Sequence, residues 1–280
     1  MAQLHKFLFF APHPALQPVV NNIMVSHTIT DESQTNLSFP FPPLPEHNIL
    51  FYPFDRPFAE DIHANQVYQL FACTIAGQHT ERSILSLGHN HLMIKIGFQP
   101  GALQRLLGEP MHRLLPCKSY DGEAVFGQQV KLVVEELAHA PNFQKMKEIA
   151  ETFMFSLLAK IRKPATIDYI IPQIIAHGGM MKIDSLIKQA HLSNRQFERT
   201  FKERMGVSPK FFSRLVRFGN AWLRKEDNPH LSWTDIAHTC NYFDQMHLIR
   251  DFKEFANANP SEIAASFKKQ PFLLKKGIFH

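Results

Sequence analysis

Two stretches of the chain repeat one pattern of basic, acidic and aromatic residues at a constant interval. The segments RTFKERMGVSP (199–209) and RDFKEFANANP (250–260) match in Arg, Phe, Lys, Glu and Pro at an offset of 51. Arginine can donate two parallel hydrogen bonds to one planar acceptor, and lysine can neutralise a phosphate. The pattern is an internal repeat, and its doubled set of cationic side chains suits an anionic partner.

The motifs of common catalytic centres are missing from the sequence. It contains no GxSxG, HExxH, GxGxxG, P-loop or CxxC pattern. We therefore predict that the protein is not an enzyme and has no catalytic residue, metal ligand or cofactor. Cys73, Cys117 and Cys240 are odd in number and widely spaced, which indicates buried thiols in a reducing compartment.

Two features of the first half leave alternatives open. His89 and His91 alternate on a predicted strand after His63 and His79, as in a cupin-like metal site, but no glutamate or further histidine follows at a fixed spacing. Ordinary core or surface histidines are therefore favoured. The phenylalanine-rich stretch 39–58 could line an apolar pocket, although core packing is the favoured interpretation.

Length and charge predict two domains with different partners. The chain has 280 residues, 45% of them hydrophobic. Residues 1–163 hold 13 Lys and Arg against 14 Asp and Glu, whereas residues 164–280 hold 17 against 11. The second half is thus the basic one. No apolar run reaches the roughly 18 residues of a membrane span, and the opening MAQLHKFLFFAPHPAL lacks the features of a secretory signal. We expect a cytoplasmic protein whose opening segment is an edge strand or arm.

The first half, residues 1–162, is predicted to be an α+β domain in which β-barrel or cupin-like strands precede helices. Prolines in FPFPPLPEH (39–47) exclude a helix there. The predicted strands are 48–54, 66–77 and 89–98, and the predicted helices are 102–108 and two within 123–162.

The second part, residues 163–270, is predicted to be all-helical, after a boundary at RKPAT (162–166) and before a tail at 271–280. Ser193, Ser232 and Asp244 are the predicted N-caps, and Pro172 either bends its helix or marks a late start. The predicted helices are 167–177, 182–190, 194–205, 208–226, 232–240, 244–256 and 260–267. A short helix, a tight turn and a longer helix occur twice, which is the plan of two helix-turn-helix units joined by a long helix.

The stretch from about 167 to 266 resembles the DNA-binding region of the AraC/XylS family of bacterial transcriptional regulators. LSNRQFERTFKERMGVSPKFF carries the resemblance in the first unit, and IAHTCNYFDQMHLIRDFKEFANANPSEI carries it in the second. The resemblance implies a sequence-specific DNA-binding regulator, either an activator or a repressor. Its recognition helices, 194–205 and 244–256, are expected to enter successive major grooves.

Several positions depart from the family pattern. His191, Asn241 and Asn257 stand where the family has glycine, and asparagine is the residue next best able to adopt a left-handed backbone. Ile187 replaces a small alanine, and Leu248 replaces a phenylalanine. These departures predict altered geometry, chiefly of the first unit, within an unchanged fold.

The resemblance implies which side chains of the recognition helices meet DNA, while the apolar residues of each helix face inward. The predicted DNA-binding residues are Arg195, Gln196, Glu198, Arg199, Lys202, Gln245, Met246, His247, Arg250 and Lys253. Arginine suits guanine, glutamine suits adenine and methionine suits a thymine methyl, whereas the two lysines suit phosphates. Arg199 and Arg250 have an alternative role in structural ion pairs with Glu203 and Glu254.

The expected partners follow from the same resemblance. They are double-stranded DNA and, for an activator, RNA polymerase. HLMIKIGFQPGALQRLLGEPMHRL (91–114) resembles an N-terminal domain of some family members, and such domains bind a small-molecule effector or form a homodimer. Two alternatives stay open: an enzyme or metal-binding barrel with a DNA-binding appendage, and an architectural DNA binder without an effector.

Overall fold

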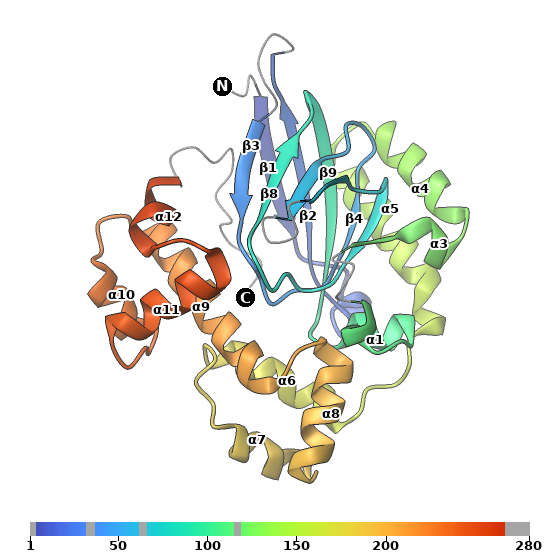
Figure 1. Cartoon of the computed structure of the whole chain (residues 1–280). Helices are drawn as coiled ribbons and strands as arrows, with labels where there is room; N and C mark the ends of the chain where they lie inside the picture. Colours follow the sequence, from blue (N-terminus) through green and yellow to red (C-terminus); the bar gives the residue numbers. More distant parts are fainter. Residues whose placement is uncertain (1–3, 32–36, 62–65, 115–118, 267–280) are drawn as a thin grey trace.

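Two antiparallel sheets form the centre of the first half (Figure 1). The computed structural model describes residues 4–31, 37–61, 66–114 and 119–266. The larger sheet has the order β1-β2-β9-β4-β7-β10, and the smaller has the order β3-β8-β5-β6. The strands are β1 (Leu4–Phe10), β2 (Val20–Ile29), β3 (Leu37–Phe41), β4 (Asn48–Phe51), β5 (Phe58–Asp61), β6 (Gln66–Gln69), β7 (Cys73–Ala76), β8 (Ser83–Leu87), β9 (Asn90–Phe98) and β10 (Ser119–Asp121).

Helices cover one face of the larger sheet, and the smaller sheet covers the other (Figure 1). The helices of this half are α1 (Ala102–Leu107), α2 (Met111–Leu114), α3 (Gly122–Phe126), α4 (Gln129–Ala138) and α5 (Phe143–Leu157). Successive strand residues point to opposite faces. On β9, Ile94 and Ile96 pack in the core with Phe153 of α5, whereas Met93 and Lys95 line a cavity between the sheets.

The second half has two separate cores that share one long helix. Its helices are α6 (Thr166–Ala176), α7 (Ile183–Ala190), α8 (Asn194–Met205), α9 (Pro209–Asp227), α10 (Trp233–Thr239), α11 (Gln245–Ala256) and α12 (Pro260–Ser266). Phe212 and Val216 of α9 pack with the first unit, α6 to α8. Leu215, Phe218 and Trp222 of the same helix pack with the second unit, α10 to α12. One continuous helix therefore holds both units.

The predicted fold class is confirmed, with strands first, then helices, then two helix-turn-helix units. Ser193, Ser232 and Asp244 cap their helices as predicted, because each side chain accepts a hydrogen bond from a backbone amide in the first turn. Pro172 lies inside α6, so the late start is wrong. The opening segment is the edge strand β1, as predicted.

Two sequence predictions about strands were incomplete. The segment 66–77, predicted as one extended stretch, is divided into β6 and β7, which belong to different sheets. Strand β2, the longest of the first half, was not predicted; its asparagines and serine interrupt the apolar alternation. In the described part of the chain, no helix is long and apolar enough to cross a membrane.

Candidate nucleic-acid interface

The turns of the two units differ by one residue. His191 ends α7 with a φ of 53°, and Asn241 follows α10 with a φ of 59°. Both residues adopt the left-handed backbone that the sequence predicted for Asn241. One residue separates His191 from the cap Ser193, but two separate Asn241 from the cap Asp244. The repeat offset therefore changes at the turn, and the second turn has room for Phe243, whose side chain is 91% exposed.

Every predicted DNA-binding residue on α8 is exposed, while Phe197 and Phe201 are fully buried on the opposite face. Helix α8 thus presents Arg195, Gln196, Glu198, Arg199 and Lys202 to solvent. The alternative ion pair between Arg199 and Glu203 exists, with 3.8 Å between Nε and Oε1. Such an exposed pair contributes little to stability, so it leaves Arg199 able to bind DNA.

Gln196 has a structural role as well. Its Oε1 accepts hydrogen bonds from the backbone N and the Oγ of Ser193, both at 3.0 Å. The reciprocal bond, from the backbone N–H of Gln196 to Ser193 Oγ, completes a capping box. A bidentate contact to adenine needs both the oxygen and the nitrogen of the side-chain amide. In this rotamer, Gln196 offers a base its nitrogen alone.

Helix α11 also exposes its predicted residues. Gln245, Met246, His247, Arg250 and Lys253 are all exposed, whereas Leu248 and Phe252 are fully buried. His247 Nδ1 lies 2.9 Å from Asp244 Oδ1. Hydrogen bonds from the backbone amide and the ring of His247 lower the pKa of Asp244. The histidine is thereby held at the start of the helix, where recognition residues meet base edges.

Arg250 is not held by the ion pair considered from the sequence. Within the described residues, Glu254 pairs with Arg214 of α9 instead. Arg214 also donates to Asp251 Oδ1 from Nε and Nη2, at 3.1 and 2.6 Å. Hydrogen bonds from Arg214 to Glu254, and then to Asp251, raise the pKa of its guanidinium. Arg214 therefore anchors α11 to α9 and leaves Arg250 for another partner.

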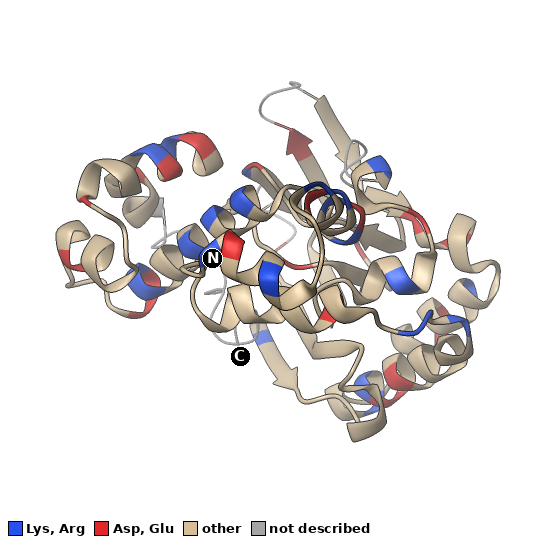
Figure 2. Cartoon of the chain, turned by 90° about the horizontal axis from the view of Figure 1, so that it is seen from below, with Lys and Arg blue, Asp and Glu red and all other residues tan. Residues whose placement is uncertain are grey.

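A basic groove of about 780 Å³ lies between the two units. Its walls come from the α6–α7 turn, from α9, from the turn before α11 and from α11 itself, including His247 and Arg250. Four of its cations were not predicted from the sequence: Lys182, Lys210, Arg214 and Arg217. A signal for them exists, since Lys210, Arg214 and Arg217 follow an i, i+4, i+7 spacing along one helix face. Figure 2 shows basic positions along the helical half in a view from below.

Among the described residues, the histidines of the first half are not gathered into the metal site considered above. His91 is buried on β9, where its Nδ1 lies 3.0 Å from the backbone oxygen of Asp55. Burial lowers the pKa of His91 to about 4. No group of three or more metal-ligating side chains occurs in the described ranges, and His63 lies outside them.

Two family models match different parts of the chain. Residues 186–266 match a helix-turn-helix domain, and residues 8–116 match a domain of unknown function (DUF6597). No curated protein sequence matches the chain.

Solved structures align with nearly all of this chain or with part of it. ToxT from Vibrio cholerae is 10% identical with a TM-score of 0.48, over 94% of this chain and 98% of that one. Its complex with an unsaturated fatty acid is 12% identical with a TM-score of 0.48, over 95% and 97%. The DNA-binding domain of AdpA, in complex with a target DNA, is 19% identical with a TM-score of 0.35, over 38% and 95%.

The match of residues 186–266 to a helix-turn-helix domain agrees with the two units of the fold, and modules of this class bind DNA. AdpA is described as a global transcriptional factor. The helix-turn-helix domain supports DNA binding by this chain.

Proposed function

We propose that this protein is a sequence-specific regulator that inserts α8 and α11 into successive major grooves of double-stranded DNA. One observation carries the proposal: all ten predicted contact residues are exposed on two helices whose opposite faces are buried. Helix α9 has 19 residues. At 1.5 Å per residue it is about 28 Å long, which compares with about 34 Å between successive grooves on one DNA face.

Base contacts and phosphate contacts come from different side chains in this arrangement. Arg195, Arg199 and Arg250 have the bidentate geometry that distinguishes guanine in the major groove. Lys202 and Lys253 lie further along their helices and suit phosphates. We assign the groove residues Lys182, Lys210 and Arg217 to the DNA backbone between the two recognition helices, because that backbone crosses from one groove to the next.

Substitution of Arg250 tests the base-reading role. A cognate site is first selected from a random duplex library with the full-length chain. Arg250→Ala should then cost about 1–3 kcal/mol on the cognate duplex and relax one base position. Lys253→Ala is the matched control, since loss of a phosphate contact weakens cognate and random DNA alike. An equal loss on both duplexes for Arg250→Ala would instead make Arg250 a phosphate contact.

The salt dependence of DNA binding tests the proposed contacts with phosphates. Release of condensed counterions makes affinity fall steeply as salt rises, and each lost phosphate contact lowers the logarithmic slope by about 1. Lys210→Ala should therefore flatten the slope without changing the preferred sequence. A flat salt response of the unmodified chain would contradict an interface that grips phosphates.

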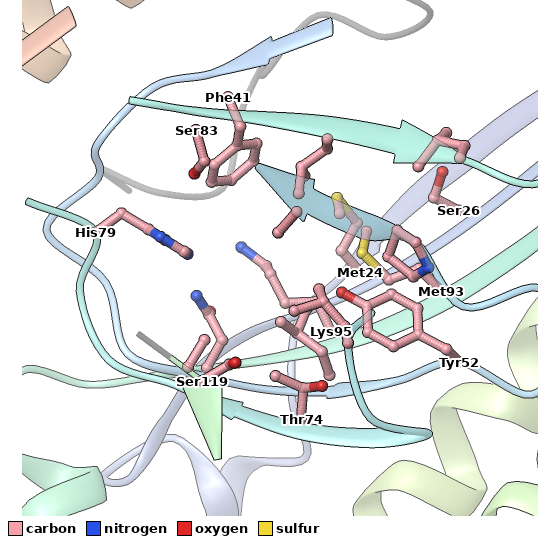
Figure 3. Close-up of a pocket in the computed structure, with 18 of the residues that line it drawn as sticks. Met24, Ser26, Phe41, Tyr52, Thr74, His79, Ser83, Met93, Lys95 and Ser119 are labelled. Carbon is pink, nitrogen blue, oxygen red and sulfur yellow. The ribbon is translucent and has the colours of Figure 1, made fainter. Parts of the chain in front are cut away.

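A small-molecule effector site is proposed for the first half. A cavity of about 100 Å³ lies between the two sheets (Figure 3), and all ten strands of the described chain contribute to its lining. Phe39 and Phe41 are among these residues, so the phenylalanine-rich stretch supplies part of a pocket wall. A thermal shift of the full chain with small apolar probes tests this site. Homodimer formation and contact with RNA polymerase remain predictions.

Each alternative can be separated from this proposal by measurement. A metal-binding or enzymatic barrel would retain a stoichiometric metal or turn over substrate, so metal analysis and an activity screen address it. An architectural DNA binder would show no ligand-induced shift of the first half and little sequence preference.

A further inference from the structure

The cavity between the sheets contains a buried ion pair in an otherwise mainly apolar wall. Lys95 Nζ lies 2.7 Å from Glu46 Oε2, and the two side chains are only 8% and 5% exposed. Removing two charges from water is costly, and apolar residues of similar size are often at least as stabilising. Figure 3 shows Lys95 reaching into the cavity near Tyr52 and Thr74. This pair is therefore a candidate for ligand recognition rather than for packing.

The two partners of the pair differ in how fully they are hydrogen-bonded. Glu46 Oε1 accepts from Asn22 Nδ2 at 2.9 Å, and Oε2 accepts from Lys95. The amide of Asn48, in the orientation that satisfies its neighbours, donates to Oε2 at 3.0 Å. An ammonium group has three donors. Among the described residues, Glu46 is the sole hydrogen-bond partner of Lys95 Nζ, so two donors are left for a ligand.

We propose that this cavity binds a small, mainly apolar and uncharged molecule whose carbonyl or hydroxyl oxygen accepts a hydrogen bond from Lys95. This inference rests on the effector site proposed above and adds the charge class of its ligand. A carboxylate at the same place would lie beside the Glu46 carboxylate, and two like charges repel strongly where water is excluded. A neutral acceptor uses the free donors of Lys95 without that repulsion.

The size and the walls of the cavity define the rest of the ligand. Its volume of about 100 Å³ is of the order that holds a single small ring or a short chain, since a dry cavity of about 150 Å³ binds benzene. Met24 and Met93 line it, and flexible thioether side chains adapt to ligands of different outline. Phe7 and Phe9 of β1 and Leu85 of β8 add rigid apolar surface from the two facing sheets.

The test compares two matched probes, 1-hexanol and hexanoate, on the full-length chain at neutral pH by titration calorimetry. We expect 1-hexanol to bind at least tenfold more tightly than hexanoate. Glu46→Gln removes the competing carboxylate. The affinity of hexanoate relative to that of 1-hexanol should therefore rise by at least tenfold. Glu151→Gln is the matched control, because Glu151 pairs with Lys147 at 2.9 Å outside the cavity lining; there the ratio should stay unchanged.

A second comparison needs no variant and stands even if Glu46→Gln does not fold. 2-Hexanone has an acceptor oxygen and hexane has none, so 2-hexanone should bind several-fold more tightly if Lys95 donates to the ligand. Equal or tighter binding of hexanoate than of 1-hexanol by the unmodified chain would overturn the charge class and leave the effector site standing. Binding of none of the four probes would overturn the effector site itself.

Discussion

The two helix-turn-helix units share one plan but are anchored to different parts of the molecule. In the first unit, Arg204 at the end of α8 donates to Asp168 of α6 and to Gln104 of α1, in the first half of the chain. In the second unit, Arg214 of α9 holds α11 through Asp251 and Glu254. Figure 1 shows α8 beside α1, while the second unit lies to the side of the smaller sheet.

This difference determines how each recognition helix can respond to the first half. Helix α8 is attached by polar side chains, so a shift of α1 would move it directly. Helix α11 meets the first half through a backbone bond, from the amide of Arg82 to the carbonyl oxygen of Phe255 at 3.0 Å. Residues 79 and 83, on either side of that contact, line the cavity. The first unit is therefore the more firmly coupled of the two to the first half, and the second is held mainly by α9.

Acid should weaken the attachment of the first unit most. Burial lowers the pKa of His47 to about 4, although the nearby Met205 backbone at the end of α8 opposes the shift. Below pH 6.5 the unfolded chain binds a proton that the folded chain excludes, so stability falls as the pH falls towards 4. The loss from His47 should reach about 3 kcal/mol.

Urea unfolding of the full chain at pH 7 and pH 4.5 measures that loss. His47→Leu should reduce the loss of unfolding free energy between pH 7 and pH 4.5. A part of the loss should persist, because the pKa of His91 is also lowered to about 4. His139→Gln, at an exposed position of the first half, is the control and should leave the loss intact. If His47→Leu has the same pH profile as the unmodified chain, His47 is not what makes the first unit sensitive to acid.

Arg214→Ala should cost about 2–3 kcal/mol, because it leaves the buried Asp251 without its cation. The free energy of unfolding and the hydrogen exchange of α11 measure the effect. Arg224→Ala, an exposed arginine of the same helix, is the control. Faster exchange in α8 than in α11 after Arg214→Ala would mean that the anchors of the two units are not independent.

Arg204→Ala should cost about 2 kcal/mol, less than Arg214→Ala, because the Ala165 amide still donates to Asp168 at 2.7 Å. Its effect should concentrate in α8 and α1, which exchange measurements can localise. Arg204→Lys keeps the charge but loses the forked geometry, so it should restore only part of the stability. Unchanged protection of α8 would show that Arg204 does not hold the first unit to the first half.

Phe243→Ser should change the free energy of unfolding least, by at most about 0.5 kcal/mol, because the side chain is 91% exposed. It should nevertheless weaken DNA binding, since an apolar side chain in the turn before α11 can contact a sugar or a thymine methyl. Val67→Ser, which removes a 66% exposed side chain from β6, is the control for DNA affinity. Equal DNA affinities of Phe243→Ser and Val67→Ser would show that Phe243 does not contact DNA.

Local features of the helical half were predictable from the sequence. Ser193, Ser232 and Asp244 cap their helices, and Asn241 adopts a left-handed turn, because each interaction involves residues at most four positions apart. The repeat of Arg, Phe, Lys and Glu also predicted two units with buried aromatic faces and exposed polar faces. The apolar spacing of a helix determines which side is buried, whatever it packs against.

The first half and the contacts between the halves depended on the tertiary structure. Lys95 and Glu46 are 49 positions apart, and Arg204 and Gln104 are 100 apart, so no local pattern relates them. The division of 66–77 between two sheets depends likewise on which strands pair. Sequence by itself determined the helical caps, the doubled unit and its polar faces, because these follow from near neighbours. Only the fold decided the cavity, its ion pair and the separate anchors, because pairing between distant segments depends on the packing of the whole chain.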